Sequence, residues 1–214
     1  MIKIILFDLG GVLVELTGVP TMLEWTNNAY DEEMLWEAWL SSPAVRSFET
    51  GYSTAEQFGD QLIREMDLPI GTAEFIRIFT QWPKGLFPGV PRLLKRLKTE
   101  YTLACLSNSN VLHWSILMNE MGLETMFDHH FASHLMHRLK PDKEAFEYVL
   151  KCLDCKAFEV LFLDDNAINV NSARDMGMMA YRVKGPKDIE QILDKTGILT
   201  SKEPETRVQG AVAP

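Results

Sequence analysis

Polar side chains that could bind a metal or a phosphate follow several apolar segments of this sequence, at the point where each segment ends. They are Asp8 after Ile2–Phe7, Ser107 and Asn108 after Tyr101–Leu106, Lys140 in the segment RLKPD, and Asp164 and Asp165 after Val160–Leu163. Clustered carboxylates repel one another unless a cation lies among them, and an all-oxygen cluster suits Mg²⁺. Lys140 would add a second positive charge, and Ser107 with nearby backbone N–H groups would hold phosphate oxygens. We therefore predict phosphoryl chemistry in which a carboxylate attacks phosphorus.

These residues meet only if the apolar segments are neighbouring strands. The expected strands are Ile2–Phe7, Tyr101–Leu106, His129–Ala132, Val160–Leu163 and Met179–Val183. The helical patterns between them are Pro91–Thr99, Val111–Met121, Asp142–Cys152 and Ile168–Met176. This alternation is typical of an α/β fold with a doubly wound parallel sheet, in which ligands bind beyond the carboxyl ends of the strands.

The segment from Thr21 to Gln81 interrupts the alternation, because it has helical periodicity and no convincing strand. It contains the expected loop Ser42–Ser53 and ends in the Pro- and Gly-rich segment WPKGLFPG. We predict an α/β core over residues 1–15 and 86–200, and a small all-helical cap over residues 16–85. Residues 201–214 are small and polar, so we expect a disordered tail there.

Four motifs occur at these strand ends: FDLGGVL, LACLSN, LKPD and VLFLDD. Their order and spacing over residues 2–185 resemble the haloacid dehalogenase-like superfamily, and the helical insertion resembles its C1-type cap. The paired aspartates resemble its Mg²⁺-dependent phosphatases rather than its dehalogenases, which do not depend on a metal. The resemblance implies that Asp8 is the nucleophile and a metal ligand, and that an aspartyl-phosphate forms.

The same resemblance implies the roles of the other site residues. The main-chain carbonyl of Gly10, Asp164 and Asp165 would complete the metal site. Ser107 and the backbone of Asn108 would hold phosphate, and Lys140 would bridge the phosphate and Asp8. The simpler interpretations are that Asp8 caps a turn, that Asp164 and Asp165 cap a helix, and that Ser107 and Lys140 are ordinary turn and surface residues.

Gly10 departs from the phosphatase pattern, because most of these enzymes carry a second aspartate there as general acid and base. A general acid contributes about 10²–10⁴-fold. The chain is therefore a slow enzyme, an enzyme for a substrate with a good leaving group, or a binding protein without catalysis. His113 and Glu15 are the first candidates for a replacement acid. The bacterial alpha-D-glucose-1-phosphate phosphatases resemble this chain in the DLG, SNSN and DDNAINV segments and around Glu49 and Gly51, which favours a sugar 1-phosphate.

Substrate contacts from the cap are expected from the loop residues Arg46, Phe48 and Tyr52, whereas most cap aromatic residues would form its own core. Two further patterns have simpler explanations. Cys152 and Cys155 have the spacing of a redox or zinc pair but no second pair, and the histidines between 129 and 137 lack metal-site spacing.

The overall composition limits the partners. The chain has 214 residues, 46% hydrophobic and 24% charged, with a net charge of −9. This charge disfavours nucleic acid and anionic membranes, so we expect a small phosphorylated metabolite as the partner and a monomer or homodimer. Three cysteines and the lack of a signal-peptide pattern favour the cytoplasm.

Overall fold

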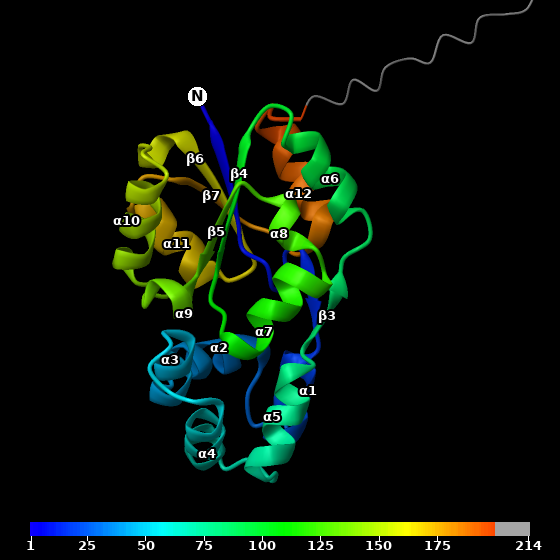
Figure 1. The fold of residues 1–214 in the computed structure, drawn as a ribbon, viewed down its shortest axis with the longest axis vertical. Coiled ribbons are helices and arrows are strands. Elements are labelled where there is room, and N and C mark those ends of the chain that lie inside the picture. The colour runs from blue at the N-terminus through cyan, green and yellow to red at the C-terminus, as the bar shows by residue number, and fades with distance from the viewer. Residues whose placement is uncertain (200–214) are drawn as a thin grey trace, which may run out of the picture.

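The computed structural model describes residues 1–199, so the predicted disorder of residues 201–214 concerns a segment outside the described residues. Five parallel strands form the central sheet in the order β5-β4-β1-β6-β7 (Figure 1). They are β1 Ile4–Phe7, β4 Thr102–Ser107, β5 His129–Ala132, β6 Val160–Asp164 and β7 Met179–Arg182. All five expected strands are confirmed, within two residues at their ends. The chain builds the sheet outward from β1 in both directions, so β1 and its neighbours meet at the switch point where ligands bind.

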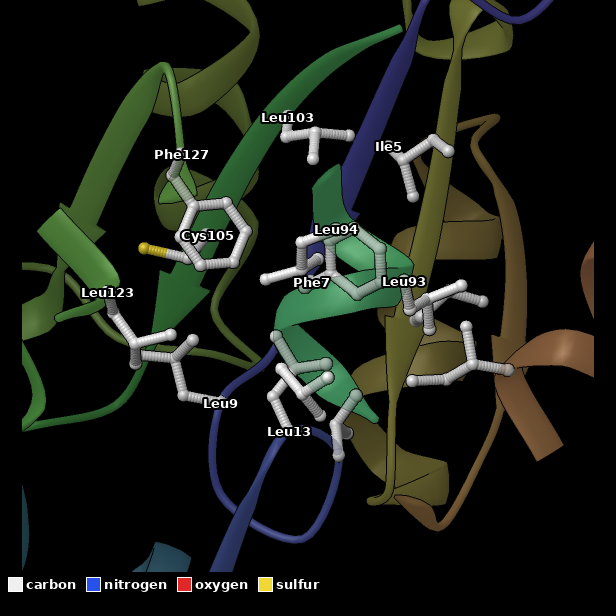
Figure 2. Close-up of a cluster of buried hydrophobic side chains, with 14 of the residues drawn as sticks. Ile5, Phe7, Leu9, Leu13, Leu93, Leu94, Leu103, Cys105, Leu123 and Phe127 are labelled. Carbon is white, nitrogen blue, oxygen red and sulfur yellow. The ribbon is translucent and has the colours of Figure 1, made fainter. Parts of the chain in front are cut away.

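Apolar side chains alternate between the two faces of the strands, so the sheet is covered on both sides. Ile5 and Phe7 of β1 pack with α6 and α12, as Figure 2 shows for part of this cluster, while Ile4 and Leu6 pack with α10 and α11. These helices are α6 Val90–Leu97, α10 Lys143–Cys152, α11 Ala167–Asp175 and α12 Gly185–Lys195. Burying each Leu, Ile or Phe contributes about 1.5–3 kcal/mol, which fixes the strand ends and the polar residues that follow them.

Short helical segments connect these elements. They are α7 Val111–Ser115, the π-helical turn η1 Ile116–Glu120, α8 Leu123–Met126, α9 Ser133–Met136 and the 3₁₀ turn η2 Ala157–Glu159. The expected helix Val111–Met121 is thus α7 continued by η1. No helix within residues 1–199 combines the length and the apolar character that crossing a membrane requires.

Five helices form a separate layer beyond the carboxyl ends of the strands, in the lower half of Figure 1. They are α1 Gly18–Trp25, α2 Glu32–Ser41, α3 Pro43–Glu49, α4 Ala55–Met66 and α5 Thr72–Thr80. The layer has its own core, in which Phe48, Phe58 and Phe79 are 1% exposed. We keep the name cap for this layer; the domain boundaries given above remain a prediction.

One expectation about this region was wrong. The expected loop Ser42–Ser53 contains α3, because Ser42 caps its N-terminus by accepting a hydrogen bond from Val45 N and Pro43 occupies its first turn. The inserted layer is helical, as expected, and two short strands that precede and follow it, β2 Val14–Leu16 and β3 Pro83–Leu86, form an antiparallel pair. Strands this short show no periodicity, so only the pairing of segments far apart in sequence reveals them.

Candidate active site

Lys140 lies at the centre of the polar cluster beyond β1 and β6. Its Nζ donates to Asp8 Oδ1 at 2.7 Å and to Asp164 Oδ2 at 2.6 Å, and the residue is only 1% exposed. Burial lowers the pKa of Lys140, but Asp164 and Asp8 together raise it above its ordinary value. Lys140 is therefore a permanently charged, buried cation rather than a solvated surface lysine.

Asn108 holds Lys140 in place through the backbone. Its side-chain Nδ2 donates to the Lys140 carbonyl at 2.8 Å, and its Oδ1 accepts from Lys140 N at 2.9 Å. The sequence suggested only the Asn108 backbone as a phosphate ligand, because a contact between positions 32 residues apart leaves no local pattern. Ser107, the last residue of β4, precedes Asn108 and is buried. Both residues line a cavity that is described below.

Three carboxylates lie together at this edge of the sheet. Asp8, Asp164 and Asp165 have oxygen atoms within 4.8 Å of one another. Burial raises the pKa of Asp8 to about 6, with Lys140 opposing the rise and Asp164 adding to it. Burial and then repulsion from Asp8 and Asp164 raise the pKa of Asp165 to about 8. The cluster holds more negative charge than Lys140 alone balances.

Asp164 is fixed by the start of α11 rather than capping it. Asn166 N donates to Asp164 Oδ1 at 2.8 Å, and Asn169 Nδ2 lies 3.1 Å from both carboxylate oxygens. Asn166 is itself the N-cap, because its side chain accepts from Ile168 N. The carboxylates of Asp164 and Asp165 are therefore free of the capping role considered above.

A cavity extends from this cluster into the cap. Asp8, Gly10, Ser107, Asn108, Lys140 and Asp165 line its polar end. Much of its remaining lining is apolar and includes Leu16, Val19, Met22, Leu35, Trp36, Trp39, Leu40, Phe79, Trp82 and Leu117. The charged residue that the cap contributes to the lining is Glu49, and Asn110 and His113 of the core line the cavity as well.

A side chain at Gly10 would have to displace the side chain of Leu16. A Cβ atom built on Gly10 would lie 2.7 Å from Leu16 Cδ1. The space that an acidic side chain at this position would enter is therefore filled by Leu16 of β2.

The structure does not place Arg46, Phe48 and Tyr52 around the cavity. Arg46 forms an ion pair of 2.6 Å with Asp142, at the start of α10. Phe48 is buried in the cap core and stacks on Phe58. Tyr52 is 72% exposed and stacks on His137. The α3 segment thus points Phe48 inward and uses Arg46 and Tyr52 to contact the core.

Neither expected replacement acid has a proton placed for the reaction. His113 lines the cavity, but its Nε2 lies 2.6 Å from the Phe79 carbonyl and its Nδ1 lies 3.3 Å from Asn110 Nδ2. Burial lowers the pKa of His113 to about 4, so the ring is neutral with both nitrogens engaged. Glu15 pairs with Lys84 at 3.4 Å and does not line the cavity.

The remaining cysteines and histidines form no comparable cluster. Within residues 1–199, the three aspartates are the group of His, Cys, Asp and Glu side chains that lie close enough to share a metal ion. Cys152 and Cys155 are both free thiols.

Comparison with known proteins identifies the family. Residues 2–177 match the model of the haloacid dehalogenase-like hydrolases. A sesquiterpene phosphatase of Aspergillus oryzae, astK, is 30% identical over 85% of this chain and 89% of its own. A D-ribitol-5-phosphate phosphatase of Bacteroides thetaiotaomicron is 24% identical over 94% of this chain and all of its own. The crystal structure of a HAD family enzyme from the same bacterium, in complex with magnesium and inorganic phosphate, superposes with a TM-score of 0.70, at 25% identity over 90% of this chain and 99% of that one. The chain therefore belongs to the haloacid dehalogenase-like hydrolases, among relatives that are phosphatases.

Proposed function

We propose that this protein is a Mg²⁺-dependent phosphomonoester hydrolase that uses Asp8 as its nucleophile. The observation that carries the proposal is the contact of Lys140 with both Asp8 and Asp164, beside a third carboxylate and at the end of a cavity. The likeness to phosphatases over most of the chain supports it.

The polar cluster fits a magnesium ion. All the candidate ligand atoms are oxygens, from Asp8, Asp164, Asp165 and the main-chain carbonyl of Gly10. The raised pKa values of Asp8 and Asp165 indicate buried negative charge that a divalent cation would offset. When bound, Mg²⁺ supplies positive charge to the phosphate and to the transition state.

The chain's own residues then perform two displacements. Lys140 keeps Asp8 ionised and donates to phosphate oxygens, and Ser107 and the backbone N–H of Asn108 hold the others. An Asp8 oxygen bonds to phosphorus while the ester P–O bond breaks, and the bonding pair leaves with the alcohol oxygen. Water then attacks the phosphorus of the aspartyl-phosphate, which releases inorganic phosphate and restores the Asp8 carboxylate.

The direct test is phosphate release from p-nitrophenyl phosphate with Mg²⁺, because its leaving group needs no acid. EDTA should abolish the activity and Mg²⁺ should restore it. The rival hypothesis of a non-catalytic binding protein predicts no release above that of Asp8→Asn. Full activity in EDTA would refute the metal requirement, and rescue by zinc alone would redirect attention to the histidines.

The cavity favours a substrate whose alcohol is apolar. Eight of its wall residues are aliphatic or aromatic side chains of the cap or of the segment that leads into it: Val19, Met22, Leu35, Trp36, Trp39, Leu40, Phe79 and Trp82. A sugar there would lose water from its hydroxyls and find few polar partners. The similarity to a sesquiterpene phosphatase agrees with an apolar alcohol. We expect farnesyl or geranyl monophosphate to have a higher kcat/KM than glucose 1-phosphate, and the reverse ranking would contradict this assignment.

A sugar 1-phosphate is the second candidate, and Gly10 favours it. An anomeric oxygen is less basic than an ordinary alkoxide, so it leaves more readily without an acid at position 10. If no other group supplies a proton, glucose 1-phosphate should be hydrolysed about tenfold or more faster than glucose 6-phosphate. Equal turnover of the two would show that another group supplies the proton. A cytoplasmic location and a monomeric or homodimeric state remain predictions.

A further inference from the structure

Glu49 is a buried carboxyl group on the wall of the cavity that contains Asp8 and Lys140. The residue is 6% exposed. Its Oε1 accepts a long hydrogen bond of 3.4 Å from Trp39 Nε1, and its Oε2 has no partner. A buried carboxyl oxygen without a protein partner destabilises the fold, and a catalytic role is one reason why a protein keeps such a group.

The surroundings of Glu49 raise the pKa of its carboxyl well above the ordinary value. Burial raises the pKa of Glu49 to about 7, while the Trp39 hydrogen bond and Lys140 lower it, Asp8 raises it and Arg46 lowers it slightly. Three other titratable groups contact α3 or the residues at its ends, and each is bonded to a partner other than Glu49: Asp142 pairs with Arg46. Glu65 of α4 bonds to Ser42 at the far end of the helix, and His137 bonds to the Thr50 carbonyl. A pKa near the working pH is the value that suits a general acid.

The position of Glu49 is set by the docking of α3 on the core. Gly51 follows with φ +78°, and a Cβ atom there would lie 2.7 Å from the backbone oxygen of His134. Only glycine allows this close approach with a left-handed backbone. The Arg46–Asp142 ion pair and the bond between His137 Nδ1 and the Thr50 carbonyl, 2.8 Å long, hold the same segment against the core.

We propose that Glu49 is the general acid of the reaction and replaces the acid that Gly10 lacks; this role rests on the proposed phosphatase function. In the first step the Glu49 proton moves to the ester oxygen as the P–O bond breaks, so the product leaves as a neutral alcohol. In the second step the Glu49 carboxylate accepts a proton from the water that attacks phosphorus. Each turnover therefore returns Glu49 to its protonated form.

The test compares two aromatic substrates of similar shape in the wild type and in Glu49→Gln. p-Nitrophenyl phosphate has a leaving group that needs no proton, whereas benzyl phosphate releases a strongly basic alkoxide. Glu49→Gln should lower kcat/KM for benzyl phosphate by about 10²–10⁴-fold and that for p-nitrophenyl phosphate by less than about threefold. The wild-type rate on benzyl phosphate should fall as the pH rises above 7, and the variant should lose this dependence.

Two matched variants complete the experiment. Glu15→Gln makes the same change outside the cavity and should leave both rates unchanged. Glu49→Asp keeps a carboxyl group on a shorter side chain and should retain more benzyl phosphate activity than Glu49→Gln. Equal losses on both substrates, or no loss on benzyl phosphate, would overturn the assignment of Glu49. Wild-type protein that hydrolyses neither substrate would overturn the proposed phosphatase function itself.

Discussion

The balance of charge around Asp8 depends on one atom, the Nζ of Lys140. The ammonium contacts Asp8 and Asp164 at the same time, and each carboxylate is nearly removed from solvent. Burial raises the pKa of Asp8 and Lys140 opposes that rise, so Lys140 favours the ionised carboxylate that the proposed mechanism requires.

Asp8→Asn should abolish turnover and preserve the fold. The amide has nearly the same shape but cannot attack phosphorus, so p-nitrophenyl phosphate hydrolysis should fall below about a hundredth of the wild-type rate. Circular dichroism should show an unchanged spectrum, because the substitution also removes one negative charge from a crowded cluster. A variant that keeps a tenth or more of the wild-type rate would exclude Asp8 as the nucleophile.

An acid at position 10 should restore the activity lost in Glu49→Gln only when the Leu16 side chain is removed. Gly10→Asp meets Leu16 Cδ1, so we pair it with Leu16→Ala to open the space. In the Glu49→Gln background, this pair should raise the benzyl phosphate rate about tenfold or more. Leu16→Ala alone is the control and should give no rescue. Failure of the pair to differ from this control would show that a carboxyl at position 10 does not reach the ester oxygen.

At the scale of elements, α3 is a helix packed against the core rather than a substrate-binding loop. Its inner face enters the cap core through Phe48, and its outer contacts reach α9 and α10 through Gly51 and Arg46. Arg46 and Phe48, which were expected to contact the substrate, therefore fix the position of the α3 segment that contains Glu49.

Gly51→Ala should disturb this docking. An alanine at φ +78° costs about 1–2 kcal/mol of strain, and its Cβ meets a backbone oxygen that cannot easily move. We expect a lower melting temperature and a larger loss on benzyl phosphate than on p-nitrophenyl phosphate. Gly71→Ala is the matched control, because nothing lies within 4 Å of its added Cβ. Equal melting temperatures for the two variants would contradict the close approach at Gly51.

At the scale of the whole molecule, the buried acids link stability to pH and metal. Carboxyls whose pKa is raised on folding bind more protons in the folded state than in the unfolded chain, so stability falls as the pH rises towards their folded values. The effect of Asp165 extends from its ordinary pKa of 3.8 up to about 8, and that of Glu49 from 4.5 up to about 7. His113, whose pKa is lowered from 6.5 to about 4, acts with the opposite sign but only below pH 6.5.

The melting temperature in EDTA should therefore decrease between pH 6.5 and pH 8.5. Mg²⁺ should raise it most at pH 8.5, because the cation binds the deprotonated carboxylates of the folded state. Asp165→Asn should flatten the decrease and reduce the gain from Mg²⁺. A melting temperature that rises over this interval in EDTA would show that the acids are not buried as described.

The sequence alone determined which polar side chains lie together at the strand ends. Buried parallel strands have continuous apolar sequences, and the residue after each of them must lie at the same edge of the sheet. The sequence therefore sufficed to predict the five strands, the doubly wound fold and the group of Asp8, Lys140, Asp164 and Asp165. Four helical patterns of the core, which correspond to α6, α7 with η1, α10 and α11, followed from their 3.6-residue periodicity, with shifted ends.

Only the tertiary structure decided what surrounds that edge. Glu49 faces the cavity, Leu16 fills the space at Gly10, and Asn108 holds the Lys140 backbone, all through contacts between segments far apart in sequence. The pairing of β2 with β3 has the same origin. The apolar lining of the cavity could not be predicted either. Trp, Phe and Leu at helical spacing form the same sequence pattern whether they pack in a core or line a binding site.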